Sequence, residues 1–169
     1  MKKTFSRRNF LQLTALGTGS ILLLPQCSNR SSSSKWLFFT NEEADLVESI
    51  IEQIIPTDDW PGAREAGVAH FIDKQLRGPY LRFQEKYRVG LDAVQLTCNE
   101  LYSKDFQQLT TEEQVQFLKK METGELTFSQ KDGKQNSLSA GEFFSLIRDH
   151  TMQGFYGSPR HGGNKDYVS

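Results

Sequence analysis

Hydrophobic residues recur every three or four positions through most of this chain, which is the spacing of one buried helix face. The first clear run lies behind Thr40-Asn41-Glu42-Glu43, a capping-box pattern that marks a helix start. Its apolar positions are Val47, Ile50, Ile51, Ile54 and Ile55. Pro56 ends this helix, because the residue before a proline is driven away from helical backbone angles.

Four further helices are predicted by the same spacing. The second begins at Ala63 or Ala66 and ends at Leu76, and the third carries one apolar seam. That seam consists of Phe83, Tyr87, Leu91, Val94, Cys98 and Leu101. The fourth and fifth helices begin with capping boxes at Thr110 and Ser139, and the fifth ends around Gly154. No alternating run predicts a strand, so residues 40–169 are expected to form a single all-α domain of about five helices with long loops containing Gly and Pro.

The N-terminal residues 1–27 have the pattern of an export signal rather than of a folded element. Adjacent Arg7 and Arg8, followed by Asn-Phe-Leu, resemble a bacterial twin-arginine signal. The apolar run from Leu11 to Leu24 is shorter than the roughly 20 residues of a membrane-spanning helix. A cleaved or anchored signal is therefore favoured, with retention as a short uncleaved anchor as the alternative.

Residues 28–39 are rich in serine at their start and are predicted to form a flexible tether. Cys27 lies where a bacterial lipoprotein carries its acylated cysteine, and ordinary cleavage near this point is the other interpretation. Cys98, the second cysteine, lies on an apolar seam and is expected to be a core residue. If Cys27 is removed or acylated, the domain has no disulfide within the chain.

The charge and the motif content of the chain exclude some classes of protein function. The full chain has a net charge of −1, and the signal carries four of its basic residues and no acidic one. The remainder is therefore acidic and lacks the basic stripe of a nucleic-acid-binding protein. The sequence contains no GxGxxG, P-loop, CxxC, CxxCH or HExxH pattern, so it assigns no catalytic and no cofactor-binding residue.

Two weaker chemical hypotheses remain. His70, Asp73, His150 and His161 could contribute to a metal site, but their spacing is not that of a known ligand set, and packed histidines are the simpler interpretation. Asp58 and Asp59 could act as an acid/base pair, although a cap on the following helix or plain solvent exposure explains them as well. The aromatic residues near the C-terminus fit either core packing or a protein interface.

Two segments together resemble the small subunit, subunit 3 or gamma, of the gluconate 2-dehydrogenase family. They are residues 55–73 and 150–164. The motif residues expected to bind a partner are Asp58, Asp59, Pro61, Gly62, Gly67, His150, Thr151, Gly154, Phe155, Gly157, Pro159, Gly162, Gly163 and Asn164.

The resemblance implies a complex with a large FAD-dependent flavoprotein of the glucose-methanol-choline type, often with a cytochrome c subunit. That large subunit oxidises a sugar, sugar acid or polyol, whereas the small subunit has no cofactor. The small subunit is expected to assist folding of its partner and to escort it through the twin-arginine translocase to a periplasmic, membrane-associated location. The alternatives are a free-standing exported lipoprotein or binding module, and a metal-dependent enzyme that uses His70, His150 and His161.

Overall fold

Three capping boxes position helix starts in the computed structural model, which describes residues 35–129 and 138–168. Thr40, Thr110 and Ser139 each accept a hydrogen bond from the amide three residues later, and the glutamate there reaches back to the cap. These caps open α2 (Asn41–Ile54), α5 (Thr111–Thr123) and α6 (Ala140–Tyr156). The remaining α-helices are α3 (Val68–Leu76) and α4 (Gln84–Tyr102). The prediction of five helices and no strand is confirmed for the described residues.

Short 3₁₀ turns connect or follow these helices. They are η1 (Leu81–Phe83), η2 (Phe106–Gln108), η3 (Pro159–His161) and η4 (Lys165–Tyr167). The last two lie in the glycine-containing C-terminal segment, residues 157–168, where no α-helix forms.

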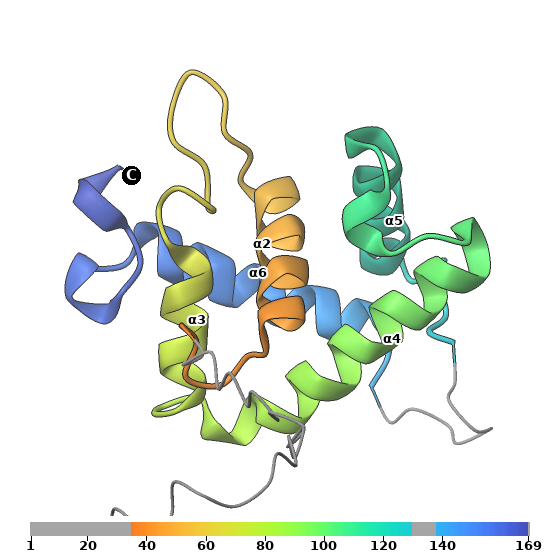
Figure 1. Ribbon diagram of the computed structural model, residues 1–169, viewed down its shortest axis with the longest axis horizontal. Helices are drawn as coiled ribbons and strands as arrows, with labels where there is room; N and C mark the ends of the chain where they lie inside the picture. Colours follow the sequence, from red (N-terminus) through yellow and green to blue (C-terminus); the bar gives the residue numbers. More distant parts are fainter. Residues whose placement is uncertain (1–34, 130–137, 169) are drawn as a thin grey trace, which may run out of the picture. The chain divides into compact units, whose positions relative to one another are not determined.

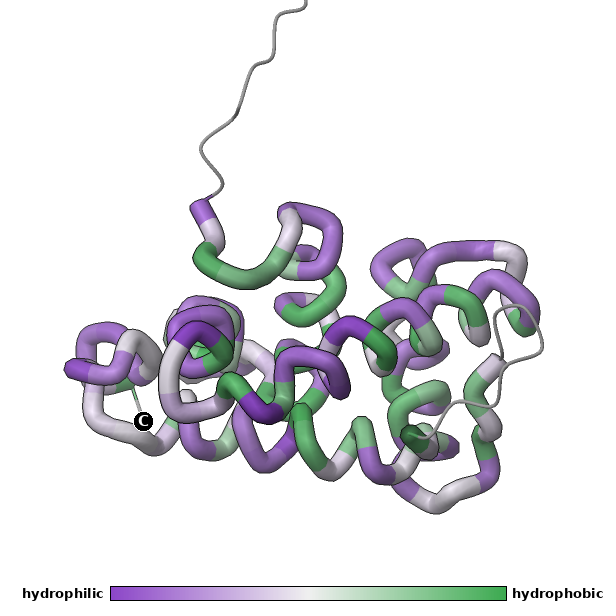
Figure 2. The backbone as a smooth tube through the Cα atoms, turned by 90° about the horizontal axis from the view of Figure 1, so that it is seen from below, coloured by the Kyte–Doolittle hydropathy of each residue, from purple (hydrophilic) through white to green (hydrophobic). Residues whose placement is uncertain are grey.

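Helices α2 and α6 form the centre of the packing. Figure 1 shows α6 passing behind α2, with α3 on one side of this pair and α5 on the other. Helix α4 packs against both α2 and α6. Green, hydrophobic positions recur along each helix in Figure 2, and the largest fully buried ones include Ile50, Ile51, Ile72, Tyr87, Phe143 and Ile147. Each such side chain contributes roughly 1.5–3 kcal/mol by leaving water, and this core holds the helices together.

Helix α3 begins later than predicted, at Val68 instead of Ala63 or Ala66. The Ala63 amide donates to the Ile55 carbonyl at 2.9 Å, which closes the preceding loop instead of starting a helix. Gly67 then adopts a left-handed conformation with φ of 72°, which glycine tolerates without a steric penalty. The predicted seam of α4 also ends early, because Leu101 is 58% exposed in the last turn.

The chain enters the helical body through residues 35–39, here called the entry segment. Its backbone amides at Leu37, Phe38 and Phe39 donate to the buried Asp73 carboxylate on α3, at 2.7, 2.8 and 2.9 Å. Arg88 on α4 holds the other side, donating to the Phe38 carbonyl at 2.7 Å. The last residues of the predicted tether are thus bound to α3 and α4, whereas residues 28–34 lie outside the described residues.

Candidate protein-interaction site

The loop between α2 and α3, residues 55–67, meets the C-terminal end of the chain. Gly154 on α6 faces α3 so closely that an added Cβ would lie 2.8 Å from Phe71 Cδ1 and 3.0 Å from Val68 Cγ1. The Lys165 amide donates to the Ala66 carbonyl at 3.0 Å. Two segments about ninety positions apart in the sequence therefore form one continuous structure around α3.

The C-terminal segment folds back on the end of α6. Gly163 packs directly on the Gly154 carbonyl, where there is no room for a side chain. Asn164 is buried, and its Nδ2 donates to the Gly157 carbonyl at 3.0 Å. Gly162 lies against α3, with its Cβ position 3.5 Å from Lys74 Cδ. These predicted partner-binding residues contribute their backbones to packing within the chain.

The loop of residues 55–67 is fixed by its own hydrogen bonds. The Gly62 amide donates to Thr57 Oγ1 at 3.2 Å, and the backbone amide of Thr57 donates to the Glu52 carboxylate at 2.9 Å. Asp58 accepts from the Trp60 amide at 2.9 Å. The predicted cap on the next helix is therefore wrong for Asp58, because its carboxylate closes a turn in the loop and α3 begins ten residues later behind Gly67.

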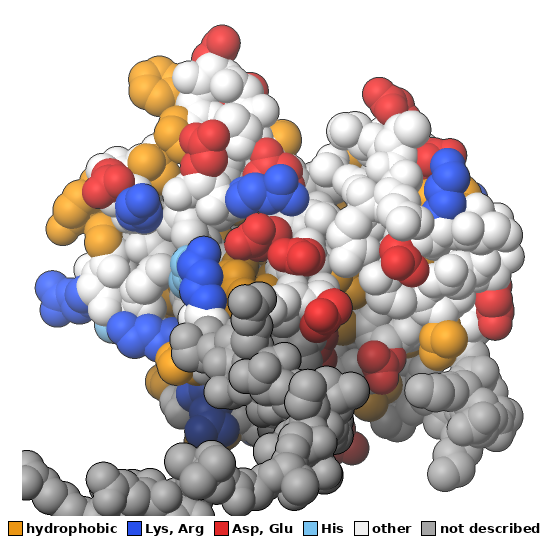
Figure 3. All heavy atoms as spheres, viewed as in Figure 1, with side chains coloured by type: hydrophobic (Ala, Val, Ile, Leu, Met, Phe, Trp, Pro, Cys, Tyr) orange, Lys and Arg blue, Asp and Glu red, His pale blue; other side chains and the backbone are white. Residues whose placement is uncertain are grey.

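An open apolar groove of about 400 Å³ lies where this loop passes the end of α6. Trp60 is 75% exposed, Tyr156 63% and Met152 42%, and all three line the groove. Its other lining residues are Ile54, Ile55, Pro56, Asp58, Pro61 and Phe155. Figure 3 shows hydrophobic side chains gathered on this loop and beside it, toward the C-terminal segment. Exposed aromatic residues beside an apolar groove are the composition of a protein-interaction site.

His150 is held inside the fold. Its ring stacks on Tyr80 with centroids 4.1 Å apart, and Phe83 packs edge-on at 5.1 Å. The Tyr87 hydroxyl and His150 Nδ1 share a hydrogen bond of 3.0 Å. Burial lowers the pKa of His150 to about 4, so the ring is neutral near pH 7. Neighbouring Thr151 is also buried and donates to the Ile147 carbonyl at 2.7 Å, so neither side chain is presented to a partner.

The three histidines considered for a metal site occupy separate environments. His70 stacks on Trp36 at 4.2 Å, His150 lies among aromatic rings, and His161 is exposed on η3. Within residues 35–129 and 138–168, no three His, Cys, Asp or Glu side chains are grouped as metal ligands would be. Cys98 is buried as predicted, and burial raises the pKa of its thiol to about 12.

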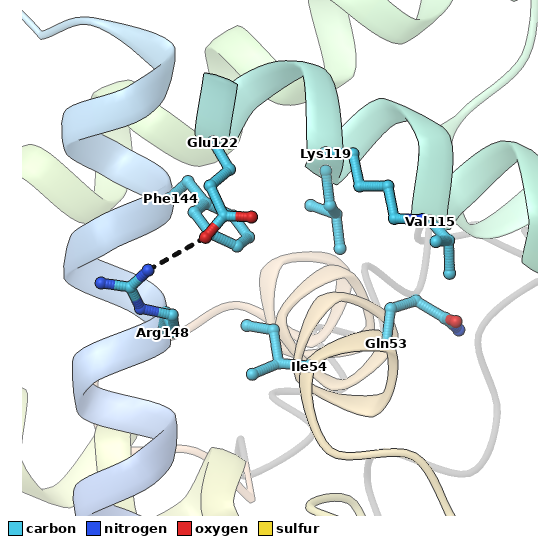
Figure 4. Close-up of a pocket in the computed structure, with 8 residues that line it drawn as sticks. Gln53, Ile54, Val115, Lys119, Glu122, Phe144 and Arg148 are labelled. Carbon is cyan, nitrogen blue, oxygen red and sulfur yellow. Dashed lines mark hydrogen bonds and ion pairs between the residues drawn. The ribbon is translucent and has the colours of Figure 1, made fainter. Parts of the chain in front are cut away.

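A second cleft of about 240 Å³ lies between α2, α5 and α6, and no sequence motif predicted it. Figure 4 shows Ile54, Val115 and Phe144 around it, with an ion pair between Arg148 and Glu122 at its edge. The two charged groups lie 3.1 Å apart. This arrangement supplies an apolar floor with a charged rim, without a nucleophile beside a general base.

The family model for gluconate 2-dehydrogenase subunit 3 matches residues 41–169. The chain belongs to the gluconate 2-dehydrogenase subunit 3 family. Neither the curated proteins nor the solved structures give a match to it. Members of this family are subunits of a dehydrogenase complex, so the chain belongs to a complex that contains other subunits.

Some of the remaining predicted residues lie in the described part of the chain and others lie outside it. Arg7, Arg8 and Cys27 lie outside the described residues. Asp59 is exposed in the loop and Pro159 opens η3. In the part of the chain that the structure describes, no helix combines the length and apolar character needed to cross a membrane.

Sequence reasoning did not single out Trp60 and Met152 as site residues. One sequence signal could have identified Trp60 as an exposed residue. The tryptophan stands directly before Pro61-Gly62 in a turn-forming loop, and such a loop gives little room to bury a large ring.

Proposed function

We propose that this subunit is a non-catalytic accessory protein that binds the FAD-dependent large subunit of a membrane-associated sugar, sugar-acid or polyol dehydrogenase. It assists folding of that flavoprotein and carries it through the twin-arginine translocase, using Arg7 and Arg8. The FAD belongs to the large subunit, and a cytochrome c subunit completes the complex in the periplasm.

The observation that carries this proposal is the groove lined by Trp60, Met152 and Tyr156. Large apolar side chains left in water at the rim of a groove gain free energy when a partner covers them. Tryptophan and tyrosine are also the residues that most often dominate binding energy at interfaces. The groove is built mainly from the two segments that carry the family resemblance, and two of the exposed aromatic side chains, Trp60 and Tyr156, lie on them.

Binding is tested by co-expressing the full chain with the flavoprotein and measuring how much flavoprotein is co-purified. We expect the double variant Trp60→Ala/Tyr156→Ala to lose at least 90% of the captured partner, since two interface anchors together contribute several kcal/mol. Leu101→Ala is the matched control, because Leu101 is a similarly exposed apolar residue on α4. Equal capture by the wild type and the double variant would refute binding through this groove.

Escort is tested separately by measuring flavin-loaded large subunit in the periplasm. We expect that subunit to stay in the cytoplasm when this chain is absent or when Arg7 and Arg8 are both changed to lysine. Equal periplasmic amounts with and without this chain would remove the escort role. If the isolated protein binds no flavoprotein at all, the free-standing binding module becomes the better interpretation.

A further inference from the structure

One side of α3 carries a row of basic residues. His70, Lys74 and Arg77 follow each other at intervals of four and three, so they share one helix face. Lys74 and Arg77 are exposed. The ion pairs among the described residues use Arg64, Arg88 and Arg148, so Lys74 and Arg77 are left without a carboxylate partner there.

Two other segments add positive charge to this row. The end of η3 lies on α3, where Gln75 Nε2 is 3.5 Å from the His161 carbonyl and the Cβ position of Gly162 is 3.5 Å from Lys74 Cδ, and η3 also carries exposed Arg160. From the entry segment, Lys35 Nζ lies 5.7 Å from the ring of Trp36, and Trp36 stacks on His70. We call the four exposed residues Lys35, Lys74, Arg77 and Arg160 the basic face.

The carboxylates near the basic face do not neutralise it. Asp73 points to the entry-segment amides and is buried. Glu48 is half-buried and lies 4.0 Å from Arg64. Figure 3 shows blue and pale blue side chains gathered over α3 and the C-terminal segment, while red ones lie mostly over the other elements. A group of exposed basic side chains on a protein of net charge −1 is a local feature that favours an anionic partner.

The position of the entry segment helps to identify the anionic partner that the basic face would bind. The entry segment begins at Lys35, which belongs to the basic face, and its next residues are bound to α3. The chain before Lys35 contains the apolar run Leu11–Leu24 and Cys27. The chain from Cys27 to Lys35 can reach at most about 28 Å, because each residue spans no more than roughly 3.5 Å. If Cys27 is held at a bilayer, Lys35 lies within about 28 Å of the lipid headgroups.

We propose that the basic face binds the anionic phospholipid headgroups of the membrane. The groove stays accessible in this orientation. Gly154 faces α3, whereas Met152 and Tyr156 are two positions away on α6 and so point to the opposite side of the helix. One surface contacts the lipid while the other contacts a protein partner. This inference rests on the membrane-associated location in the proposed function, and the vesicle assay below gives a result independent of flavoprotein capture.

The test measures binding of the full chain to sucrose-loaded vesicles by sedimentation. The informative quantity is the ratio of partition coefficients between vesicles with 30% phosphatidylglycerol in phosphatidylcholine and vesicles of phosphatidylcholine alone. This ratio removes the contribution of the apolar N-terminal run. Each cation near an anionic surface strengthens binding about fivefold, so we expect Lys74→Gln/Arg77→Gln to lower the ratio about 25-fold. We also expect 0.5 M NaCl to bring the wild-type ratio close to one.

The matched control is Lys119→Gln/Lys120→Gln on α5, which removes the same charge from exposed positions on the other side of α2 (Figure 1). The control is expected to change the ratio less than twofold. An unchanged ratio for Lys74→Gln/Arg77→Gln, or an equal fall in both pairs, would overturn the proposal. Unchanged vesicle binding combined with reduced capture of the flavoprotein would overturn it too, and would assign the basic face to a protein interface.

Discussion

The buried Asp73 is the most informative single position for testing the fold, because its carboxylate binds three consecutive backbone amides of the entry segment. Its Oδ1 accepts from Phe38 and Phe39 at 2.8 and 2.9 Å, and its Oδ2 accepts from Leu37 at 2.7 Å. The substitution Asp73→Asn keeps the size of the side chain. It removes the negative charge and places an amide NH₂ group opposite one of the backbone N–H donors.

The cost follows from these three bonds. One charge-assisted hydrogen bond is lost, worth about 1.5–3 kcal/mol, and the other two become weaker neutral bonds. We therefore expect Asp73→Asn to lower the free energy of unfolding by about 3 kcal/mol. For a domain of this size, that is a fall in Tm of about 10 °C.

Urea unfolding followed by tryptophan fluorescence measures this change. The chain has two tryptophans, so a Trp60→Phe background leaves Trp36, which is buried against His70 in the entry segment itself. Asp45→Asn is the matched control, because Asp45 is exposed on α2 and its loss should cost less than about 0.5 kcal/mol. The reasoning is refuted if both variants unfold at the same urea concentration with the same slope.

Three further predictions concern packing and titration. Gly163→Ala should destabilise the protein by 3 kcal/mol or more, since its Cβ would collide with the Gly154 carbonyl, whereas Gly78→Ala should stay within about 0.5 kcal/mol in the same denaturation assay. The pKa of His150 is about 4 in the fold against 6.5 ordinarily, so the unfolded chain takes up the proton first as the pH falls. Stability should therefore be complete above pH 6.5 and fall by up to about 3 kcal/mol toward pH 4, with a shallower decline in His150→Gln, and an equal slope in both proteins would exclude this titration. Iodoacetamide should modify Cys98 only when the chain unfolds, because burial raises its pKa to about 12, and rapid labelling of the native protein, read by peptide mass, would contradict the burial.

The helices were predictable because their signals are local. A capping box needs only Thr40 and Glu43, or Ser139 and Glu142, and an apolar face needs only spacing along one helix. The start of α3 was not predictable in this way. It depends on the hydrogen bond from Ala63 to Ile55, which forms only when the loop closes.

Contacts between distant segments explain the other differences. Leu126 and Phe128 are buried although they lie in a stretch that reads as a polar loop, and the Ser129 amide after them donates to Thr97 on α4 at 2.9 Å. The entry segment has no helical period, so its attachment to Asp73 left no pattern in the sequence.

Partner binding by the two motif segments stays a prediction, and the structure shows how those segments pack. The two motif segments were expected to bind a partner, and the structure brings them together around α3. Gly154, Gly163 and Asn164 pack inside the chain, while Trp60 and Tyr156 are the side chains left exposed at the groove. Sequence alone does not separate a glycine needed for backbone packing from one needed at an interface.

The attachment of the entry segment also has a mechanical consequence. A pull on the chain from its N-terminal side is transmitted first to Trp36, which stacks on His70 of α3, and then to the amides of Leu37, Phe38 and Phe39 held by Asp73. Helix α2 begins only beyond these residues, at Asn41. Tension is therefore diverted into α3 and α4, and the first turn of α2 bears load only after the three bonds to Asp73 and the bond from Arg88 to the Phe38 carbonyl have broken. The attachment of the entry segment therefore shields the start of α2 from a force applied to the N-terminal side of the domain.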